Sequence, residues 1–356
     1  MLIGLAPLSG VQALAQVAAP GQAQDPAAKR EGGERLRVVG GLAGVNQYLL
    51  YEEPFWSVEL SRLSGGRYGA EIVPYDRAGI RAQEMLSLVR SGVVPIGTLS
   101  LGALTTALPE IGAPDLAGLN PDVSSLRATV AAFRAQAVQL LRQRFGIEVL
   151  AIYAYPAQAI FCAKPFVDLR ALAGRRVRTA SVSQADFVEA LGAKPVPTAF
   201  AEIVSNVRAG NIDCAITGTM SGNSIGLFEV TSHVHAMAIN WGLTFFVANG
   251  AAWKSLPADL RALLARELPK LEQRIWDESE RETGMGLACN AGSAACTNGR
   301  KGAMTVVTAS RQDEALRRDI FGTVVLPRWL QRCGAQCAPM WNQTLGATSG
   351  IEARVR

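Results

Sequence analysis

The sequence predicts an α/β protein made of two lobes. Three observations carry this prediction: the chain has 356 residues, short apolar strands alternate with amphipathic helices, and the alternation restarts after a long helix at 129–145. Alternation of this kind favours βαβ units, in which helices cover both faces of a parallel sheet. A chain of this length is long enough for two such units.

The first lobe opens with the strand 36–39, which runs into the glycine-rich segment 40–44. Glycines follow its predicted helices, and glycine adopts the left-handed conformation that commonly terminates a helix. The apolar residues of the second helix lie on one face, as expected for a helix packed on a sheet. The elements after the glycine-rich segment are the helix 56–64, the strand 70–75, the helix 80–91 and the strand 93–99.

The second lobe begins after the helix 129–145, which ends at Gly146. A long helix is predicted over 258–280, with a kink at Pro269, because proline removes a backbone hydrogen bond. The residues beyond this helix are less regular. The elements between the two long helices are the strand 148–154, a turn and short helix at 165–173, the strand 176–179, the helices 183–191 and 201–209, and the strand 215–218.

The amino-acid composition argues against several classes of protein function. Hydrophobic residues make up 49% of the chain and charged residues 18%, so the chain can form a core and is not intrinsically disordered. Two histidines leave little material for a histidine-based metal site or catalytic triad, and no metal ion or cofactor is expected. The net charge of +5 is small for the length of the chain, which argues against nucleic acid as a partner.

Residues 1–24 are interpreted as a signal peptide. They contain no charged side chain, the segment 2–8 is apolar, and Ala13-Leu14-Ala15 fits a small-x-small cleavage site. The Lys or Arg of a usual signal peptide is missing, so the true start and the cleavage site stay open. Glycine, proline and polar residues interrupt the run of roughly 20 apolar residues that a membrane span needs. We therefore expect an exported, soluble protein.

The six cysteines also favour an oxidising compartment. Cys162 and Cys214 lie in apolar surroundings and are predicted to be buried free thiols. The other four lie in loop-like sequence, and three pairings among them are conceivable. A four-thiolate zinc site is the alternative, although the spacings C-x6-C and C-x3-C differ from the usual C-x2-C. The four residues predicted to form one or two disulfides are Cys289, Cys296, Cys333 and Cys337.

The sequence also contains a match to the G-x-S-x-G motif of α/β-hydrolases, centred on Ser224. That fold needs an acid and then a histidine that come from separate loops further along the chain. Only Glu229, His233 and His235 follow, within eleven residues of the serine. The match is therefore interpreted as coincidental and the two histidines as structural, so no catalytic residue is assigned.

Several segments together have the character of family motifs, and the most specific is PFVDLRALAGRRVRT at 165–179. The supporting segments, in chain order, are LSGGR at 63–67 with VP at 73–74, LGAKPVP at 191–197, FAEI at 200–203, GNID at 210–213 and NGAAWKSLP at 249–257. With these segments the chain resembles the substrate-binding proteins of tripartite ATP-independent periplasmic (TRAP) transporters, of the DctP type. The resemblance covers about 35–285, and the region with the four late cysteines lies outside it.

The resemblance implies a two-lobed fold like that of periplasmic binding proteins, with a central cleft and a long bracing helix. Each lobe is then built from two separate parts of the chain. The implied division is a signal peptide at 1–24, a first lobe from 35–155 and about 240–265, a second lobe from 156–239 and about 285–345, and a connecting helix at 258–284.

In that family an arginine at the position of Arg178 binds the carboxylate of the ligand, and the resemblance implies this role for Arg178. A guanidinium suits the task because it presents two parallel N–H donors to two carboxylate oxygens and keeps its proton. Strand alternation places Arg176 and Arg178 on one face, so only the resemblance distinguishes them.

The resemblance implies further ligand-binding positions. Sialic-acid-binding members carry an arginine where this chain has Gln158 and an asparagine where it has Thr217. Phe200 stands where the family has an aromatic residue that packs on the ligand, although a core position is the alternative. The remaining candidates are Asn240, Trp241 as pocket floor or core residue, and Ser100 after the strand 93–99.

The neutral side chains of Gln158 and Thr217 leave a second ligand carboxylate without a cationic partner. The implied ligand is therefore an organic acid anion, expected to be a monocarboxylate with an apolar or aromatic body. The implied function is a periplasmic receptor that delivers this acid to TRAP permease subunits and performs no chemistry. A binding protein for another transporter or a sensor is the alternative, with an exported hydrolase less favoured. Whether the chain dimerises stays open.

Overall fold

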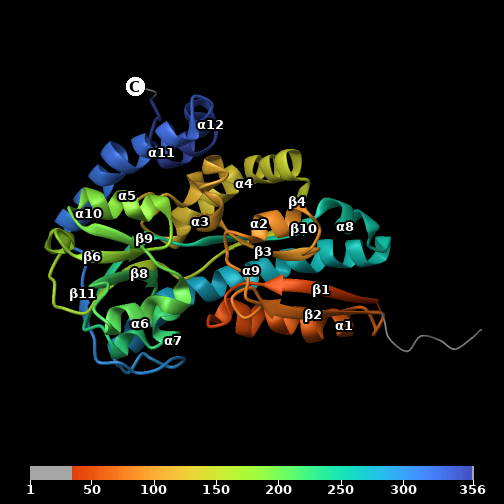
Figure 1. Ribbon diagram of the computed structural model, residues 1–356, viewed down its shortest axis with the longest axis horizontal. Coiled ribbons are helices and arrows are strands. Elements are labelled where there is room, and N and C mark those ends of the chain that lie inside the picture. Colours follow the sequence, from red (N-terminus) through yellow and green to blue (C-terminus); the bar gives the residue numbers. More distant parts are fainter. Residues whose placement is uncertain (1–33, 355–356) are drawn as a thin grey trace, which may run out of the picture.

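The computed structural model describes residues 34–354, which form two mixed β-sheets flanked by helices (Figure 1). The α/β fold class predicted from the sequence is confirmed. The predicted signal peptide at 1–24 lies outside the described residues. None of the helices within 34–354 is both long enough and apolar enough to cross a bilayer.

The first sheet has five strands in the order β2-β1-β3-β10-β4. β1 pairs in parallel with both of its neighbours, whereas β10 is antiparallel to β3 and to β4. The fully parallel sheet expected from strand–helix alternation is therefore wrong for this half, because a strand from late in the chain inserts between β3 and β4. The strands are β1 (Glu34–Gly40), β2 (Tyr68–Pro74), β3 (Ile96–Ser100), β4 (Ile147–Ala154) and β10 (Leu243–Asn249).

The second sheet has six strands in the order β11-β9-β5-β8-β6-β7. β6 is parallel to β7 and β8, while β5 is antiparallel to β8 and β9. The strands are β5 (Gln158–Cys162), β6 (Arg176–Thr179), β7 (Lys194–Pro197), β8 (Cys214–Gly218), β9 (His233–Asn240) and β11 (Thr305–Val307).

Helices cover both sheets, and the last ones lie over α3 and α4 (Figure 1). The C-terminal region, expected to be irregular, is largely helical. The first-sheet helices are η1 (Gln47–Glu52), η2 (Phe55–Glu59), α1 (Leu60–Leu63), α2 (Met85–Arg90), α3 (Leu101–Leu104), η3 (Pro109–Asp115), α4 (Val123–Phe145) and α8 (Gly250–Ser255). The others are η4 (Leu169–Leu172), α5 (Val182–Ala190), η5 (Phe200–Glu202), α6 (Ile203–Arg208), α7 (Thr219–Ser224), η6 (Leu227–Glu229), α9 (Ala258–Asn290), α10 (Arg311–Ile320), η7 (Phe321–Val325), α11 (Leu326–Cys333), α12 (Cys337–Trp341), η8 (Asn342–Gly346) and α13 (Ala347–Ser349).

The chain passes between the sheets at two short crossovers, 155–157 after β4 and 241–242 after β9. The second crossover turns sharply, and Gly242 has a φ of 74°, a left-handed conformation that favours glycine. The buried carboxylate of Asp115 holds this turn, because it accepts hydrogen bonds of 2.8 Å from the backbone N–H groups of both Trp241 and Gly242.

The 33-residue helix α9 runs from the first sheet to the second (Figure 1). Glu272 accepts a 2.9 Å hydrogen bond from the backbone N–H of Ile152 in β4. At the other end Asn290 donates a 2.9 Å hydrogen bond to the carbonyl of Thr219, the first residue of α7. The helix is therefore bonded to elements that belong to both sheets.

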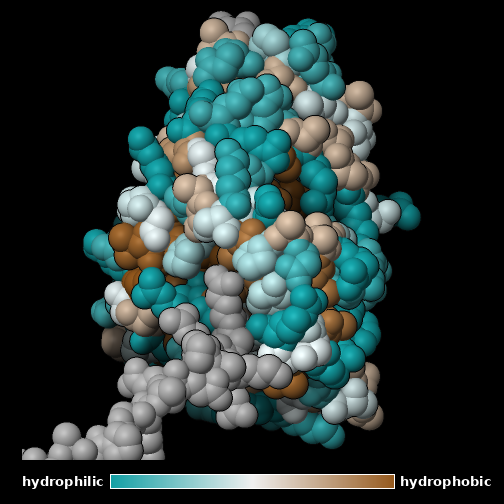
Figure 2. All heavy atoms as spheres, turned by 90° about the vertical axis from the view of Figure 1, so that its right-hand side faces the viewer, coloured by the Kyte–Doolittle hydropathy of each residue, from teal (hydrophilic) through white to brown (hydrophobic). Residues whose placement is uncertain are grey.

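The surface is mixed in character. On the face at the right-hand end of Figure 1, hydrophilic side chains dominate and hydrophobic side chains gather in patches across the middle (Figure 2). The largest side chains that are fully buried include Trp56, which stacks on Phe246 of β10 with 5.3 Å between ring centroids. This pair joins the early helices to the centre of the first sheet.

All six cysteines form disulfides, which corrects one expectation. Cys162 and Cys214, predicted to be free thiols, are bonded to each other because β5 and β8 pair in antiparallel register with these two residues directly opposite. The late cysteines pair locally, Cys289 with Cys296 and Cys333 with Cys337, so the zinc alternative is wrong. Within 34–354 no group of His, Cys, Asp and Glu side chains is arranged to hold a metal ion.

Intact-mass measurement is expected to find three disulfides in the purified protein. Alkylation of the denatured, unreduced chain should label no cysteine, since every thiol is already bonded. After reduction the chain should gain the mass of two hydrogens per disulfide and accept six labels. Two labels before reduction, mapped to Cys162 and Cys214, would restore the free-thiol interpretation.

Candidate functional site

Arg178 lies on β6 and is buried, with 4% of its surface exposed. Its Nη1 donates a 2.6 Å hydrogen bond to the carbonyl of Ile216, and its Nε donates a 3.0 Å bond to the carbonyl of Thr198. Within residues 34–354, Nη2 has no hydrogen-bond partner and no carboxylate forms an ion pair with the guanidinium. Burial disfavours the charged form and lowers the pKa of Arg178 to about 10. The structure therefore buries a cation without a counter-charge.

The neighbouring arginines differ from Arg178. Arg176, on the same strand, forms an ion pair with Asp213, with 2.7 Å between Nη2 and Oδ1, and its side chain is 42% exposed. Arg175 donates to two backbone carbonyls of the preceding loop. The structure therefore separates Arg178 from its neighbours, which strand alternation could not do.

The loop after β1 approaches Phe200, which belongs to the helices around the second sheet. A methyl group placed on Gly44 would lie 3.8 Å from the Phe200 ring and 3.7 Å from Ile225, so the loop passes close to both side chains. Phe200 is half-buried and packs in a small apolar cluster that includes Leu42 and Tyr155. Phe200 thus lies at a contact between the two sheets' loops.

A second contact of the same kind involves α3 and the end of β6. A methyl group on Gly102 would lie 3.2 Å from the carbonyl oxygen of Ala180 and 3.4 Å from the Cβ of Ser181. Gly102 belongs to the loop and helix that follow β3, and Ala180 directly follows β6. Arg178 is two residues before this contact, so its strand ends where the two halves touch.

A cavity of about 70 Å³ lies beside this second contact. Three predicted site residues line it together: Ser100 from β3, Gln158 from β5 and Asn240 from β9. Its other walls come from α3, η3, the start of α5 and α11. The structure therefore brings Ser100, Gln158 and Asn240 to one cavity, at the junction of the sheets.

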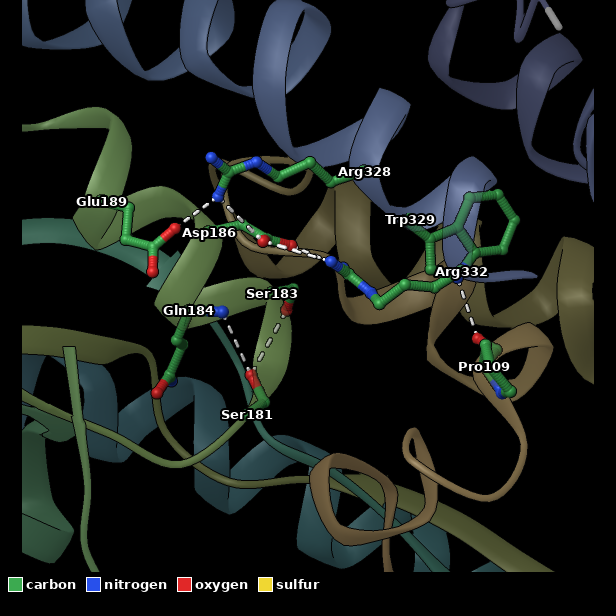
Figure 3. A network of polar contacts seen from close by, with 9 residues as sticks. All are labelled: Pro109, Ser181, Ser183, Gln184, Asp186, Glu189, Arg328, Trp329 and Arg332. Carbon is green, nitrogen blue, oxygen red and sulfur yellow. Dashed lines mark hydrogen bonds and ion pairs between the residues drawn. The ribbon is translucent and has the colours of Figure 1, made fainter. Parts of the chain in front are cut away.

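A chain of amide and carboxylate contacts connects α5 to the crossover 241–242. Gln184 accepts a 2.7 Å hydrogen bond from the N–H of Ala180 and donates a 2.7 Å bond to Oδ1 of Asn240. Asn240 in turn donates a 3.0 Å bond to Asp115, which holds the crossover. Burial raises the pKa of Asp115 to about 6, although four N–H donors favour its charged form. Ser181 caps the start of α5 beside these groups (Figure 3).

The helix α11 contributes Trp329 and Arg332 to the lining of the cavity, and Figure 3 shows the contacts of both. Its Trp329 donates a 2.8 Å hydrogen bond from the indole N–H to the carbonyl of Pro109. Its Arg332 forms an ion pair with Asp186 of α5, and Arg328 reaches Asp186 and Glu189. These contacts tie the C-terminal helices to the helix that follows β6.

Four predicted site residues do not line this cavity: Arg178 and Phe200, described above, and Thr217 and Trp241. Thr217 is buried on β8, with its methyl group 3.2 Å from the position that a Cβ on Gly222 would take. Trp241 is buried in the main core, and its indole N–H donates a 3.1 Å hydrogen bond to the carbonyl of Asn120. The indole of Trp241 thus packs in the main core, with its polar atom already satisfied.

The serine and histidines of the hydrolase motif are structural. The hydroxyl of Ser224 donates a 3.0 Å hydrogen bond to the carbonyl of Met220 within α7. Nδ1 of His233 lies 2.9 Å from the hydroxyl of Ser232, and Nδ1 of the buried His235 accepts a 3.2 Å bond from the N–H of Met237. Ser224 is the last residue of a helix, whereas a nucleophile elbow places the serine between strand and helix.

The sequence analysis did not select two buried tyrosines of the first sheet's loops, Tyr75 and Tyr155. Tyr75 directly follows β2, is 8% exposed and has no hydrogen-bond partner for its hydroxyl among residues 34–354. Tyr155 lies in the first crossover, where a methyl group on Gly41 would come within 3.0 Å of its hydroxyl. The one sequence feature that could have identified Tyr75 is its position directly after a predicted strand. Side chains that follow the carboxyl ends of strands line the crevice of α/β proteins.

The carboxyl of Glu52 lies under the loop after β1 and is fully buried. It accepts a 2.7 Å hydrogen bond from the N–H of Gly41 and another from the hydroxyl of Tyr153. A methyl group on Gly41 would lie 2.9 Å from this carboxyl, so a larger residue there would have to displace it. Burial raises the pKa of Glu52 from 4.5 to about 7.

Glu52 is expected to make the protein less stable as the pH rises. The folded state holds the proton up to about pH 7, whereas the unfolded state releases it near pH 4.5, so stability falls between these values. The shift corresponds to about 3 kcal/mol of unfolding free energy. Urea unfolding measures the free energy of unfolding at pH 5 and at pH 8. Between these two pH values Glu52→Gln should lose less unfolding free energy than the wild type. Equal losses would contradict this role, and the exposed Glu53→Gln should behave as the wild type.

Comparison with known proteins extends these observations. Residues 52–286 match the family model of bacterial extracellular solute-binding proteins, family 7. A Bordetella pertussis extracytoplasmic solute receptor binding pyroglutamic acid has a TM-score of 0.78 at 21% identity, covering 89% of this chain and 99% of that one. A Desulfovibrio salexigens TRAP periplasmic solute-binding protein with bound orotic acid has a TM-score of 0.77 at 15% identity, covering 89% and 99%. A Sulfitobacter protein of this type with bound β-D-galacturonate has a TM-score of 0.74 at 16% identity, covering 87% and 99%. At these identities the likeness establishes the shared fold.

Proposed function

Because the chain belongs to family 7 of the bacterial extracellular solute-binding proteins, we propose that it binds one organic acid anion at Arg178 and delivers it to TRAP permease subunits. The family match agrees with the TRAP-receptor resemblance found in the sequence. Receptors of this family act outside the cytoplasm, and we place this chain in the periplasm. The three disulfides support that compartment, because such bonds persist in oxidising surroundings.

The unpaired, buried guanidinium of Arg178 carries this proposal. Burying a charge without a partner costs several kcal/mol, so such groups are normally paired. Arg176, which is more exposed, has Asp213 as its partner, whereas Arg178 has only two backbone carbonyls. A carboxylate bound to the free Nη2 edge would supply the missing negative charge and accept charge-assisted hydrogen bonds.

The neutral surroundings of the site support a ligand with a single carboxylate. Ser100, Gln158 and Asn240 line the cavity next to Ala180, just after the end of β6, and carry no charge. Asp115 and Arg332 also line it, but both are satisfied by partners within the protein. Pyroglutamic acid, orotic acid and galacturonate, the ligands of the similar structures, each carry one carboxylate on a compact ring. We propose a ligand of this class, with its apolar face against Phe200.

The binding motion is proposed to follow the two sheets. The first lobe would comprise 35–155 and about 240–265, and the second 156–239 and about 285–345. The crossovers 155–157 and 241–242 would act as hinges, with α9 connecting the lobes. Ligand contacts to both lobes would shift the population towards the closed form.

Native mass spectrometry of the purified protein, followed by a thermal-shift panel, tests this function. The panel contains pyroglutamate, orotate, galacturonate, a dicarboxylate such as succinate, and neutral sugars. A co-purified acid of matching mass, or a rise in melting temperature with monocarboxylates alone, is the expected result. Stabilisation by neutral sugars and by no acid would overturn the proposal.

A further inference from the structure

The last helices of the chain form a packed unit outside the matched family model, which ends at residue 286. Trp329 of α11 packs on Trp341, with 5.7 Å between ring centroids, and the rings of Trp341 and Phe321 are 6.1 Å apart. A disulfide joins Cys333, the last residue of α11, to Cys337, the first residue of α12. The helix α11 is therefore held by its own region, and we expect the two to move as one body.

One side of α11 is bonded to the helices of the first sheet. The indole N–H of Trp329 donates a 2.8 Å hydrogen bond to the carbonyl of Pro109, the first residue of η3. Asp115, at the other end of η3, holds the crossover 241–242. Trp329 is 2% exposed and belongs to the main hydrophobic core. Separating this attachment would expose a tryptophan to water, which is unfavourable.

The other side of α11 is bonded to α5, the helix that follows β6 of the second sheet (Figure 3). Arg332 approaches the carboxylate of Asp186 with both ends of its guanidinium, at 2.5 Å and 3.2 Å. Arg328 lies 3.2 Å from Asp186 and 2.5 Å from Glu189. Asp186 is only 5% exposed, and within residues 34–354 its carboxylate is bonded to these two arginines alone. A buried carboxylate needs a partner, so Asp186 depends on α11 for its neutralisation.

The two attachments of α11 differ in how easily they can break. The side chains of Arg328 and Arg332 are 42% and 35% exposed, so water can reach both guanidinium groups. Trp329, in contrast, is buried. If α5 moves away from α11, water can solvate the separated charges, whereas Trp329 stays packed in the core. The ion pairs with Asp186 are therefore the attachment that can break and form again.

We propose that α11 is a strap that holds the two lobes closed, anchored at η3 by Trp329 and fastened to α5 by Arg328 and Arg332. The helix lines the cavity beside the contact of Gly102 with Ala180, so it spans a place where elements of the two sheets touch. Opening moves α5 away from η3 and breaks the ion pairs. The inference rests on the proposed movement of the two lobes and does not depend on the identity of the ligand.

The strap increases ligand affinity without touching the ligand. The apparent affinity of a binding protein is the affinity of its closed form reduced by the fraction of molecules that are closed. Ion pairs that exist only in the closed form raise that fraction. Loss of these partly exposed ion pairs should therefore weaken ligand binding about fivefold, whichever acid is bound.

Small-angle X-ray scattering of the ligand-free protein tests the strap. Asp186→Asn removes the charge on the α5 side and leaves the sequence of α11 unchanged, while the double variant Arg328→Met/Arg332→Met removes the charges on the other side. Both should have a larger radius of gyration than the wild type and keep its helix content in circular dichroism. Arg142→Met is the matched control, because its 2.6 Å ion pair with Glu148 joins two elements beside the first sheet, and its radius should equal that of the wild type.

The outcomes separate the strap from the proposed function. Variants with the radius of the wild type would show that α11 does not hold the lobes. A larger radius accompanied by a loss of helix content would mean that the helices have unfolded locally, which also contradicts the strap. If the wild type binds an acid of the panel and the radii are equal, the strap is wrong and the proposed function stands. If no acid binds and both variants open with intact helices, the proposed function fails and the strap stands.

Discussion

Replacing Arg178 by methionine is expected to abolish ligand binding while leaving the ligand-free protein at least as stable as the wild type. Charge-assisted hydrogen bonds contribute about 1.5–3 kcal/mol each, so losing two of them weakens binding by about 100-fold or more. The ligand-free protein loses only an unpaired buried charge and two bonds to carbonyls, and apolar replacements of buried charges are often neutral or stabilising. Calorimetry and thermal unfolding measure the two effects separately.

Arg176→Met is the matched control on the same strand. Arg176 forms an ion pair with Asp213 and is partly exposed, so its loss should leave ligand affinity unchanged. Exposed ion pairs contribute about 0–1 kcal/mol, and a small loss of stability is expected. A variant Arg178→Met that unfolds far below the wild type would show that the guanidinium is structural. Loss of binding in Arg176→Met would show that the wrong arginine was assigned.

Replacing Gly286 by alanine is expected to cause a large loss of stability, because this glycine lets α9 approach α7. A methyl group at this position would lie 2.3 Å from the backbone N of Met220 and 2.4 Å from the carbonyl carbon of Thr219. Both neighbours are backbone atoms, which cannot rotate away as a side chain could. Overpacking of this kind costs about 1–3 kcal/mol, and we expect the upper end of that range in urea unfolding.

Gly284→Ala, two residues earlier on the same helix, is the control. A methyl group there meets no atom within 4 Å. Alanine is favoured over glycine inside a helix by about 0.5–1 kcal/mol, so this variant should be slightly more stable than the wild type. Equal stabilities for the two variants would mean that the close packing of α9 on α7 does not exist in solution.

Local patterns in the sequence were sufficient for most elements. The strand 176–179 was predicted with the bounds that β6 has, because its alternation and the glycine at 174 are local signals. The antiparallel strand β10 between β3 and β4 was not predicted, since its place depends on partners about 100 residues or more away in the chain. The disulfide between Cys162 and Cys214 was missed for the same reason, because only the pairing of β5 with β8 brings them together.

In the candidate site, too, some features could be predicted from the sequence and others depend on the tertiary structure. Arg178 was singled out by a resemblance, and its isolation from any carboxylate required the tertiary structure, because burial and partners are not sequence properties. Ser100, Gln158 and Asn240 come from three different strands, and the structure places them along one cavity. Tyr75 belongs to no motif. Its burial at the end of β2 is visible only once its surroundings are known, which is why the sequence could not identify it.

Comparing an acid with its carboxamide tests the central claim most directly. The measurement is the affinity of the wild-type protein for pyroglutamate, or for the better-binding acid of the panel, and for the amide in which a neutral –NH2 replaces one carboxylate oxygen. If the buried cation of Arg178 binds a carboxylate, the acid should bind about 100-fold more tightly than the amide, since shape is kept and charge is removed. Equal affinities for acid and amide would contradict the account.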